Sequence, residues 1–178
     1  MRNEVYWIEG PWSGRLAIIA RPRGGDWLVD EVESWRQTGF DAILSLLTPS
    51  EIEELELTQE AALCQNASIR FFSFPIDDRN VPSSQKMMLG FTSNLVSLLL
   101  EGQSIGIHCR QGIGRSALLV SCLLVVMGVL PEVALQRTAT ARGCAVPDTE
   151  EQRRWIFDFA RYAAMPCTAM LHGQGAAK

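Results

Sequence analysis

Short apolar runs alternate with longer amphipathic segments over most of the 178-residue chain. This alternation is typical of an α/β fold, in which crossover helices join the strands of one sheet. The predicted strands are residues 16–20, 42–47, 69–74 and 104–107. In the middle two, apolar residues stand at adjacent positions, as expected for strands covered on both faces. We therefore expect a central, mostly parallel sheet of about four or five strands with helices on both faces.

Helical patterns fill the segments between and after these strands. The predicted helices are residues 27–38, a helix beginning at 49, and residues 83–101, 116–127, 131–141 and 149–163. Gly39 is a favoured residue just past a helix end. Thr48, Pro49 and Glu51 combine a capping residue, a proline at the first helical position and a glutamate three residues after the cap. No linker or repeat interrupts the pattern, so we expect residues 1–166 to form one domain and residues 167–178 to be a mobile tail.

Composition excludes several classes of partner and cofactor. The net charge is −4 and there is no long basic run, so no nucleic-acid or anionic membrane surface is predicted. The first ten residues lack the pattern of a signal peptide, and the most apolar stretch, residues 117–130, is shorter than the roughly 20 residues of a membrane span. A cytoplasmic location is expected. Five cysteines without a Cys-x-x-Cys pair and two histidines predict free thiols and neither a metal nor a cofactor.

One loop, residues 107–116, joins the last predicted strand to a predicted helix, which is where α/β sheets bind ligands. Its sequence is Ile-His-Cys-Arg-Gln-Gly-Ile-Gly-Arg-Ser. The two glycines allow the chain to curl with its backbone N–H groups pointing inward, and the helix N-terminus adds partial positive charge. We therefore expect a phosphate-binding loop formed by Arg110, Gln111, Gly112, Ile113, Gly114 and Arg115.

Side chains of this loop are suited to chemistry on a bound phosphate. Arg115 offers two parallel donors that match two phosphate oxygens, a geometry that lysine cannot reproduce. Cys109 faces the same N–H groups and is expected to be partly or wholly a thiolate nucleophile. Ser116 is expected to donate its hydroxyl to the sulfur when the sulfur leaves, and His108 to orient the loop by hydrogen bonding to backbone. The alternative, that Cys109 is a small buried hydrophobe, is disfavoured because position, spacing and residue types agree.

The pattern His-Cys-x5-Arg-Ser at residues 108–116 resembles the signature of the protein tyrosine phosphatase superfamily. Members of this superfamily hydrolyse phosphate esters through a phosphocysteine intermediate without a metal. The size of the chain resembles that of the compact dual-specificity branch, and kinase-associated phosphatase is one similar relative. The resemblance covers residues 42–163 and is specific at the loop. It implies phosphorylated proteins as substrates, with phosphotyrosine favoured and phosphoserine or phosphothreonine admitted by a shallow pocket.

The resemblance also implies roles outside the loop. Residues 74–82 are similar to the acid loop Pro-x-x-Asp-x-x-x-Pro of the family, which assigns Asp78 as general acid. A solvated turn is the alternative for this segment. Gln152 is similar to the glutamine that positions the hydrolytic water, but with Thr149 it would also form a capping box, and both interpretations stay open. Glu51 could pair with Arg115 as in several relatives, yet its helix start explains it already, and no pairing is predicted.

Two other functions are considered. A phosphatase of small soluble phosphates, such as inositol phosphates, would favour a wide basic rim, and lipid phosphatases of the superfamily typically carry lysines in the loop, where this chain has Arg110, Gln111 and Ile113. A noncatalytic phosphoresidue-binding module would need neither a nucleophile nor an acid. Cys64 or Cys144 could trap an oxidised Cys109 as a disulfide, although an ordinary thiol is the favoured interpretation of each. The sequence makes no prediction of the oligomeric state.

Overall fold

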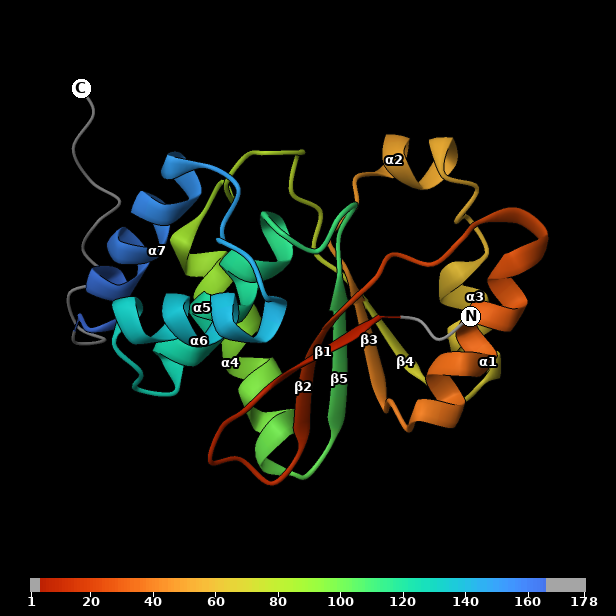
Figure 1. Cartoon of the computed structure of the whole chain (residues 1–178), viewed down its shortest axis with the longest axis horizontal. Coiled ribbons are helices and arrows are strands. Elements are labelled where there is room, and N and C mark those ends of the chain that lie inside the picture. The colour runs from red at the N-terminus through yellow and green to blue at the C-terminus, as the bar shows by residue number, and fades with distance from the viewer. Residues whose placement is uncertain (1–3, 166–178) are drawn as a thin grey trace.

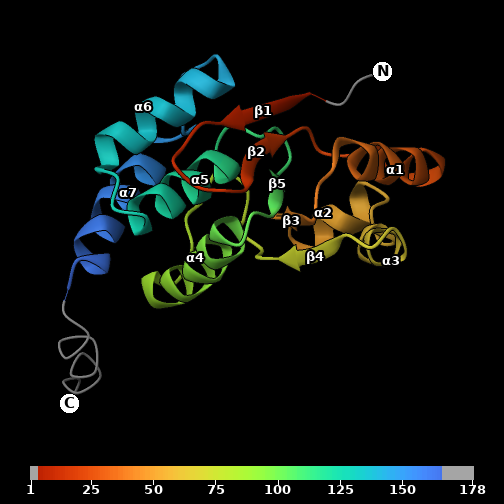
Figure 2. The ribbon, with the colours of Figure 1, turned by 90° about the horizontal axis from the view of Figure 1, so that it is seen from below.

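The computed structural model describes residues 4–165, which form a five-stranded sheet between two layers of helices (Figure 1). The strands lie in the order β1-β2-β5-β3-β4 (Figure 2). Their bounds are β1 Val5–Ile8, β2 Arg15–Ile19, β3 Ala42–Ser45, β4 Arg70–Ser73 and β5 Ser104–His108. Only the pair β1 and β2 is antiparallel. The predicted mostly parallel sheet is confirmed, while the predicted tail, residues 167–178, lies outside the described residues.

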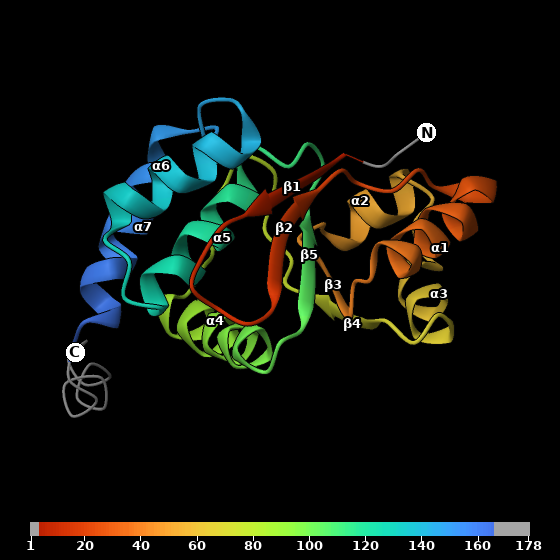
Figure 3. The same cartoon turned by 60° about the horizontal axis from the view of Figure 1, so that its bottom comes forward.

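Helices cover both faces of the sheet, as the sequence predicted. They are α1 Leu28–Thr38, α2 Pro49–Glu54, α3 Glu60–Asn66, α4 Gln85–Leu100, α5 Arg115–Val126, α6 Pro131–Arg142 and α7 Glu150–Ala163. Helices α1 and α3 pack on one face and α4 to α7 on the other, so the protein has two separate apolar cores (Figure 3). All ten residues 115–124 of α5 are buried, because this helix lies between the sheet and its neighbours α4, α6 and α7. No helix in the described part of the chain is long and apolar enough to cross a membrane.

The predicted helix ends are confirmed where local chemistry determines them. Gly39 follows α1 with φ of 83°, a left-handed conformation that glycine adopts without steric cost. Thr48 caps α2, and the reciprocal bonds of a capping box to Glu51 are both present. Thr149 and Gln152 form a second capping box at the start of α7.

One strand, one α-helix and the short 3-10 helix η1, Gly25–Trp27, were not predicted, and another strand differs from its expectation. β1 is a four-residue edge strand that exists through its pairing with β2, and α3 is only seven residues long, so neither carries a strong periodic signal. β3 is fully buried, as expected for a strand covered on both faces. β4 was expected to be equally covered, but it is the other edge strand, and its Arg70 and Ser73 are exposed.

The register of the parallel strands brings three loops to one edge of the sheet. Ser45 at the end of β3 is paired with both Ser73 of β4 and His108 of β5. The backbone continues this alignment, because Leu46 N–H donates to the His108 carbonyl at 3.0 Å and Ile76 N–H to the Leu46 carbonyl at 3.2 Å. The segments leading to α2, to the expected acid loop and to the cysteine loop therefore start side by side at the carboxyl edge, where open α/β sheets bind ligands.

Candidate active site

Cys109 follows β5 directly and lies at the base of the loop, with only 2% of its surface exposed. The Gly112 N–H donates a hydrogen bond to its Sγ, with the nitrogen 3.2 Å from the sulfur. Gly112 has φ of 68°, so a side chain at this position would strain the turn. A Cβ on Gly114 would lie 3.0 Å from Gln152 Oε1 and 3.1 Å from the Asp148 Cβ, so this position too must stay small. The glycines let the loop curl around the sulfur, as the sequence predicted.

Arg115 is the first residue of α5, and its side chain is 1% exposed. Its Nη1 and Nη2 donate to the two carboxylate oxygens of Glu51 at 2.7 and 2.8 Å. Nη1 also donates to the carbonyl of Ile76 at 2.8 Å, and Nη2 to Asp78 Oδ1 at 2.9 Å. Burial alone would lower the pKa of Arg115, but the hydrogen bonds to Glu51 and the charge of Cys109 raise it above its ordinary value. The guanidinium is therefore a fixed positive charge beside the sulfur.

The pair between Glu51 and Arg115 corrects the sequence analysis, which predicted none. Glu51 Oε2 accepts the Thr48 N–H of the capping box at 3.0 Å and the Arg115 bond as well, so one side chain serves both purposes. Burial by itself would raise the pKa of Glu51, but hydrogen bonds from Arg115 and Thr48 outweigh it and hold that pKa below 4.5. The helix start explained the glutamate completely in the sequence, and only the alignment of β3 with β5 reveals its second partner.

Asp78 lies on the rim of the site, with 58% of its side chain exposed. The segment around it is also a turn, since Asn80 N–H donates to the Asp77 carbonyl at 3.0 Å and Arg79 has φ of 58°. The turn interpretation is therefore confirmed, and the role of Asp78 as general acid stays a prediction. The turn directs Asp78 into a pocket of about 100 Å³ above the sulfur, which Asp77 does not line. The pocket is lined by Asp78, Arg79, Cys109, Gln111, Ile113, Gly114, Arg115 and Asp148.

Gln152 is completely buried between α7, the cysteine loop and the acid loop. Its Oε1 accepts the Thr149 N–H at 3.3 Å, which is the capping bond, and its Nε2 donates to the carbonyl of Asn80 at 3.0 Å. The capping interpretation is therefore confirmed, and the same side chain also ties α7 to the acid loop. Its expected role toward water stays a prediction.

His108 and Ser116 are both fully buried beside the nucleophile. His108 Nε2 lies 2.8 Å from Glu60 Oε1 of α3. Within the described residues neither ring nitrogen makes the backbone hydrogen bond that the sequence predicted, and the atom next to Nε2 belongs to a carboxylate of α3, a helix that was not predicted. Ser116 Oγ has no hydrogen-bond partner among the described residues, so its hydroxyl is free to turn toward a new acceptor.

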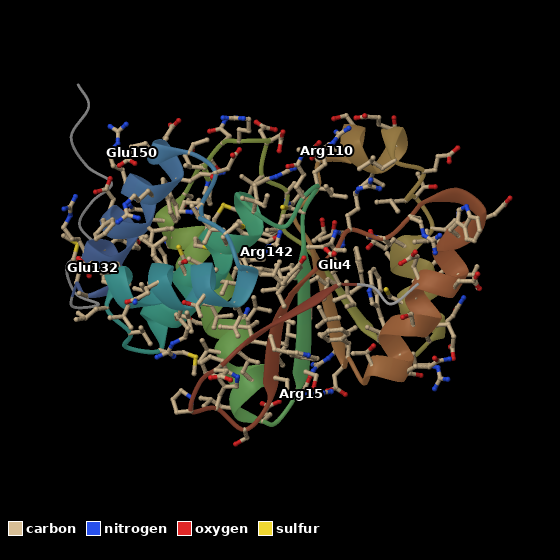
Figure 4. All side chains as sticks on the ribbon, viewed as in Figure 1. Glu4, Arg15, Arg110, Glu132, Arg142 and Glu150 are labelled. Carbon is tan, nitrogen blue, oxygen red and sulfur yellow. The ribbon has the colours of Figure 1, made fainter. Side chains whose placement is uncertain are left out.

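The other charged residues at the pocket are paired. Arg110 Nη1 donates to Glu54 Oε2 at 3.0 Å, so its side chain points toward α2 and leaves only its backbone to the loop (Figure 4). Arg79 Nε lies 3.6 Å from Asp148 Oδ2. In the described part of the chain, no group of three or more His, Cys, Asp or Glu side chains could hold a metal ion. The four described cysteines are free, and of these only Cys144 is exposed.

The sequence of this chain is similar to those of known phosphatases. The chain is 37% identical over 89 residues to the phosphatidylinositol 3,4,5-trisphosphate 3-phosphatase and protein-tyrosine-phosphatase PTEN1 of Arabidopsis thaliana, which covers 47% of this chain and 21% of that protein. It is 25% identical over 131 residues to human cyclin-dependent kinase inhibitor 3, covering 72% and 61%. The chain thus spans less than two thirds of either relative.

The fold is that of solved cysteine phosphatases. A crystal structure of kinase-associated phosphatase superimposes with a TM-score of 0.82 at 21% identity, covering 92% of this chain and 97% of that one. Residues 18–129 match the family model Tc-R-P, described as "polymorphic toxin system, DSP-PTPase phosphatase". This match covers more than half of the chain and includes Cys109 and Arg115. The chain therefore belongs to the DSP-PTPase phosphatase family, as its loop signature indicated.

Proposed function

We propose that this protein is a metal-independent phosphomonoesterase that removes phosphate from phosphotyrosine in proteins through a phosphocysteine intermediate. One observation carries the proposal. The Cys109 sulfur, the Gly112 N–H that donates to it, the Arg115 guanidinium and the Asp78 carboxylate meet at one small pocket. Binding a phosphate would require only the donors, whereas a nucleophile and a carboxyl group at the same pocket support catalysis.

In the first step the Cys109 thiolate attacks phosphorus and the ester oxygen leaves. Backbone N–H groups of the loop and Arg115 hold the equatorial oxygens, so charge that develops in the transition state meets donors already in place. Asp78, in its protonated form, gives its proton to the leaving oxygen. The sulfur–phosphorus bond forms as the phosphorus–oxygen bond breaks.

In the second step water attacks the phosphocysteine. Asp78, now a carboxylate, takes the proton of that water, and the sulfur leaves as a thiolate. Ser116 follows Arg115, and its buried hydroxyl has no hydrogen-bond partner among the described residues. Its donation to the sulfur would stabilise the departing charge. Gln152 holds the carbonyl of Asn80, two residues after Asp78, and we propose that it supports the placement of the acid and the water.

The charges at the pocket favour a phosphoprotein over a polyphosphorylated small molecule. Arg110 is paired with Glu54 and Arg79 lies next to Asp148. Both of these basic side chains near the mouth are thus offset by carboxylates, and the described residues 4–165 form no wide basic rim for several phosphates. The match to a phosphatase whose name includes phosphatidylinositol 3,4,5-trisphosphate makes that lipid the second candidate substrate.

A reducing compartment suits this chemistry, because a thiolate nucleophile is lost on oxidation. The free thiols of the described cysteines support a cytoplasmic location.

The test compares phosphate release from matched phosphotyrosine and phosphothreonine peptides, an inositol polyphosphate and vesicles containing phosphatidylinositol 3,4,5-trisphosphate. We expect the phosphotyrosine peptide to have the highest kcat/KM, and Cys109→Ser to abolish turnover while the fold is retained. Arg115→Lys should fail almost as badly, because a point charge cannot replace the planar fork. Preference for the lipid or the inositol phosphate would reject the proposed substrate. Near-normal turnover by Cys109→Ser would reject the mechanism itself.

A further inference from the structure

Arg142, the last residue of α6, reaches the back of the cysteine loop from outside the pocket. Its Nε donates to the carbonyl of Gly112 at 2.7 Å, and its Nη2 to the carbonyl of Gln111 at 3.4 Å. The guanidinium also lies over the ring of Tyr6 in β1, with Cζ 3.8 Å from the ring centroid. Figure 4 shows Arg142 at the end of α6, the helix that packs against β1. The guanidinium thus lies between the N-terminal strand and two consecutive carbonyls of the loop.

These two carbonyls determine where two N–H groups point. In a planar trans peptide the C=O and the following N–H point in opposite directions. Holding the Gln111 and Gly112 carbonyls outward therefore turns the N–H groups of Gly112 and Ile113 inward. The Gly112 N–H does point inward, since it donates to Cys109 Sγ at 3.2 Å.

We propose that Arg142 is a positioning residue, which holds the loop amides in the orientation that binds the transferring phosphoryl group. This inference rests on the proposed phosphatase function. A loop with glycines at 112 and 114 has little intrinsic preference for one peptide orientation. A peptide turned the other way would present a carbonyl oxygen to the phosphate and repel it. Arg142 disfavours that state because the turned peptide would leave its guanidinium without an acceptor.

Tyr6 of the N-terminal strand β1 holds the Arg142 side chain in place. A guanidinium stacked on an aromatic ring gains cation–π attraction and loses freedom to reorient. Helix α6 also packs against β1, so the strand that carries Tyr6 also supports the helix that carries Arg142. Neither Tyr6 nor Arg142 lies within residues 18–129, the segment that matches the family model. The inference therefore assigns to this chain a support for the loop that its family signature does not contain.

The experiment compares Arg142→Gln, Arg142→Lys and Tyr6→Leu with a matched control, Arg137→Gln. Arg137 belongs to the same helix and also bonds to the N-terminal segment, through the carbonyl of Glu9 at 3.3 Å, but it does not contact the loop. The readouts are kcat and KM on aryl phosphates, the inhibition constant of vanadate, the pH dependence of Cys109 alkylation, and the thermal midpoint.

We expect Arg142→Gln to lower kcat/KM by about 100-fold, the cost of a misplacement of roughly 1 Å caused by a mutation outside the reacting groups. Vanadate inhibition should weaken by at least tenfold, and alkylation of Cys109 should shift to higher pH, because the amide that donates to the sulfur is no longer held. The loss should be equal for good and poor leaving groups, since the proton donor is untouched. Arg142→Lys should keep part of the activity that Arg142→Gln loses. The kcat/KM of Tyr6→Leu should lie between that of Arg142→Lys and that of the wild type, and Arg137→Gln should behave as wild type.

Kinetics and vanadate affinity of Arg142→Gln equal to those of Arg137→Gln would overturn the inference. If Arg142→Gln does not fold, Tyr6→Leu and Arg142→Lys decide the question, and wild-type vanadate affinity in both would overturn it as well. Vanadate binding measured by calorimetry needs no turnover. A wild-type protein that binds vanadate but hydrolyses no phosphotyrosine would reject the proposed function, and the effect of Arg142 on anion binding would still be read.

Discussion

Asp78 Oδ1 accepts a hydrogen bond from Arg115 Nη2 at 2.9 Å, so the proposed acid occupies a donor that the proposed phosphate clamp needs. The other donors of the two terminal nitrogens are directed to Glu51 and to backbone carbonyls. Among the described residues Nε has no hydrogen-bond partner. The edge of the guanidinium formed by Nε and Nη2 is thus the one a phosphate can use in bidentate fashion, after Asp78 has moved from Nη2.

Removing Asp78 should therefore strengthen oxyanion binding while it weakens catalysis. In Asp78→Ala no carboxylate competes for Nη2 or repels the anion, and we expect vanadate or inorganic phosphate to bind several-fold more tightly. Calorimetric titration measures this directly, with Asp77→Ala as the control that should leave the affinity unchanged. Weaker binding in Asp78→Ala would mean that Asp78 supports the anion site and does not compete for it.

The proton donor is tested by the leaving-group dependence of Asp78→Asn. General acid catalysis contributes about 10²- to 10⁴-fold, and it matters most when the departing phenoxide is basic. Asp78→Asn should therefore depress hydrolysis of phenyl phosphate far more than that of 4-nitrophenyl phosphate. Asp77 does not line the pocket, and Asp77→Asn should alter neither rate much. The opposite assignment of these two effects would move the acid to Asp77 and leave the cysteine chemistry intact.

Glu51 should make stability depend on pH, through its pair with Arg115. The pKa of Glu51 is lowered in the folded protein, so the stabilisation is fully present above its ordinary value of 4.5 and is lost as the pH falls below it. Glu51→Gln should lower the free energy of unfolding at pH 7 by roughly 1–3 kcal/mol, as for a buried hydrogen bond to a charged group. The loss should shrink toward pH 3.

Urea titrations at pH 7 and pH 3 measure this difference. The control is Glu54→Gln, which removes the exposed partner of Arg110 and should change stability little. If Glu51→Gln lowers the free energy of unfolding equally at both pH values, the stabilisation does not come from the ionised Glu51 carboxylate.

The geometry of the cysteine loop was the most predictable part of the site from the sequence. Cys109 and Arg115 are six residues apart in one loop, and the strand, glycines and helix that position them are all local. Asp78 was proposed as the acid through its spacing to two prolines, and four of the five strands, β2 to β5, were predicted through their apolar runs. These features depend on neighbours in sequence, which a pattern records.

The supports of the site depend instead on long-range pairing. Glu51 reaches Arg115 because β3 lies beside β5, and Glu60 reaches His108 from a short helix with little periodicity. Arg142 reaches the loop from the end of α6. Each of these three residues has an adequate local explanation as a helix residue, so its sequence neighbours give no sign of the second partner.

Gln152 can be separated into its two structural roles by one substitution. Gln152→Glu keeps an oxygen that accepts the Thr149 N–H, and glutamate is as good as glutamine in a capping box. It loses the Nε2 donor, however, and faces the Asn80 carbonyl with a negative charge. We expect kcat to fall at least severalfold, since the acid loop is no longer tied, and the thermal midpoint to fall as well, because the new carboxylate is completely buried. Unchanged kinetics with an unchanged thermal midpoint would restrict Gln152 to capping.

Cysteine reactivity should divide the described thiols into two pairs. Burial, with a contribution from the charge of Glu60, raises the pKa of Cys64 to about 12, and burial alone raises that of Cys122 well above its ordinary value. Neither can act as a nucleophile at neutral pH, because the thiolate is the reactive form. Cys144 is exposed. Brief treatment with iodoacetamide should therefore modify Cys109 and Cys144 and leave Cys64 and Cys122 protected until the protein unfolds.

The difference between buried and accessible thiols also determines which cysteine can form a disulfide with an oxidised Cys109. A sulfenic acid condenses with a reactive thiol, so Cys144 is the better candidate of the two that the sequence suggested. After mild peroxide treatment, mass spectrometry should show either a Cys109–Cys144 disulfide or oxidised Cys109 without a linkage. A Cys109–Cys64 disulfide would require local unfolding around α3 and would contradict the protection expected for Cys64. If Cys144 is the resolving thiol, dithiothreitol should restore activity in the wild type, and Cys144→Ser should lose that recovery as peroxide exposure is prolonged.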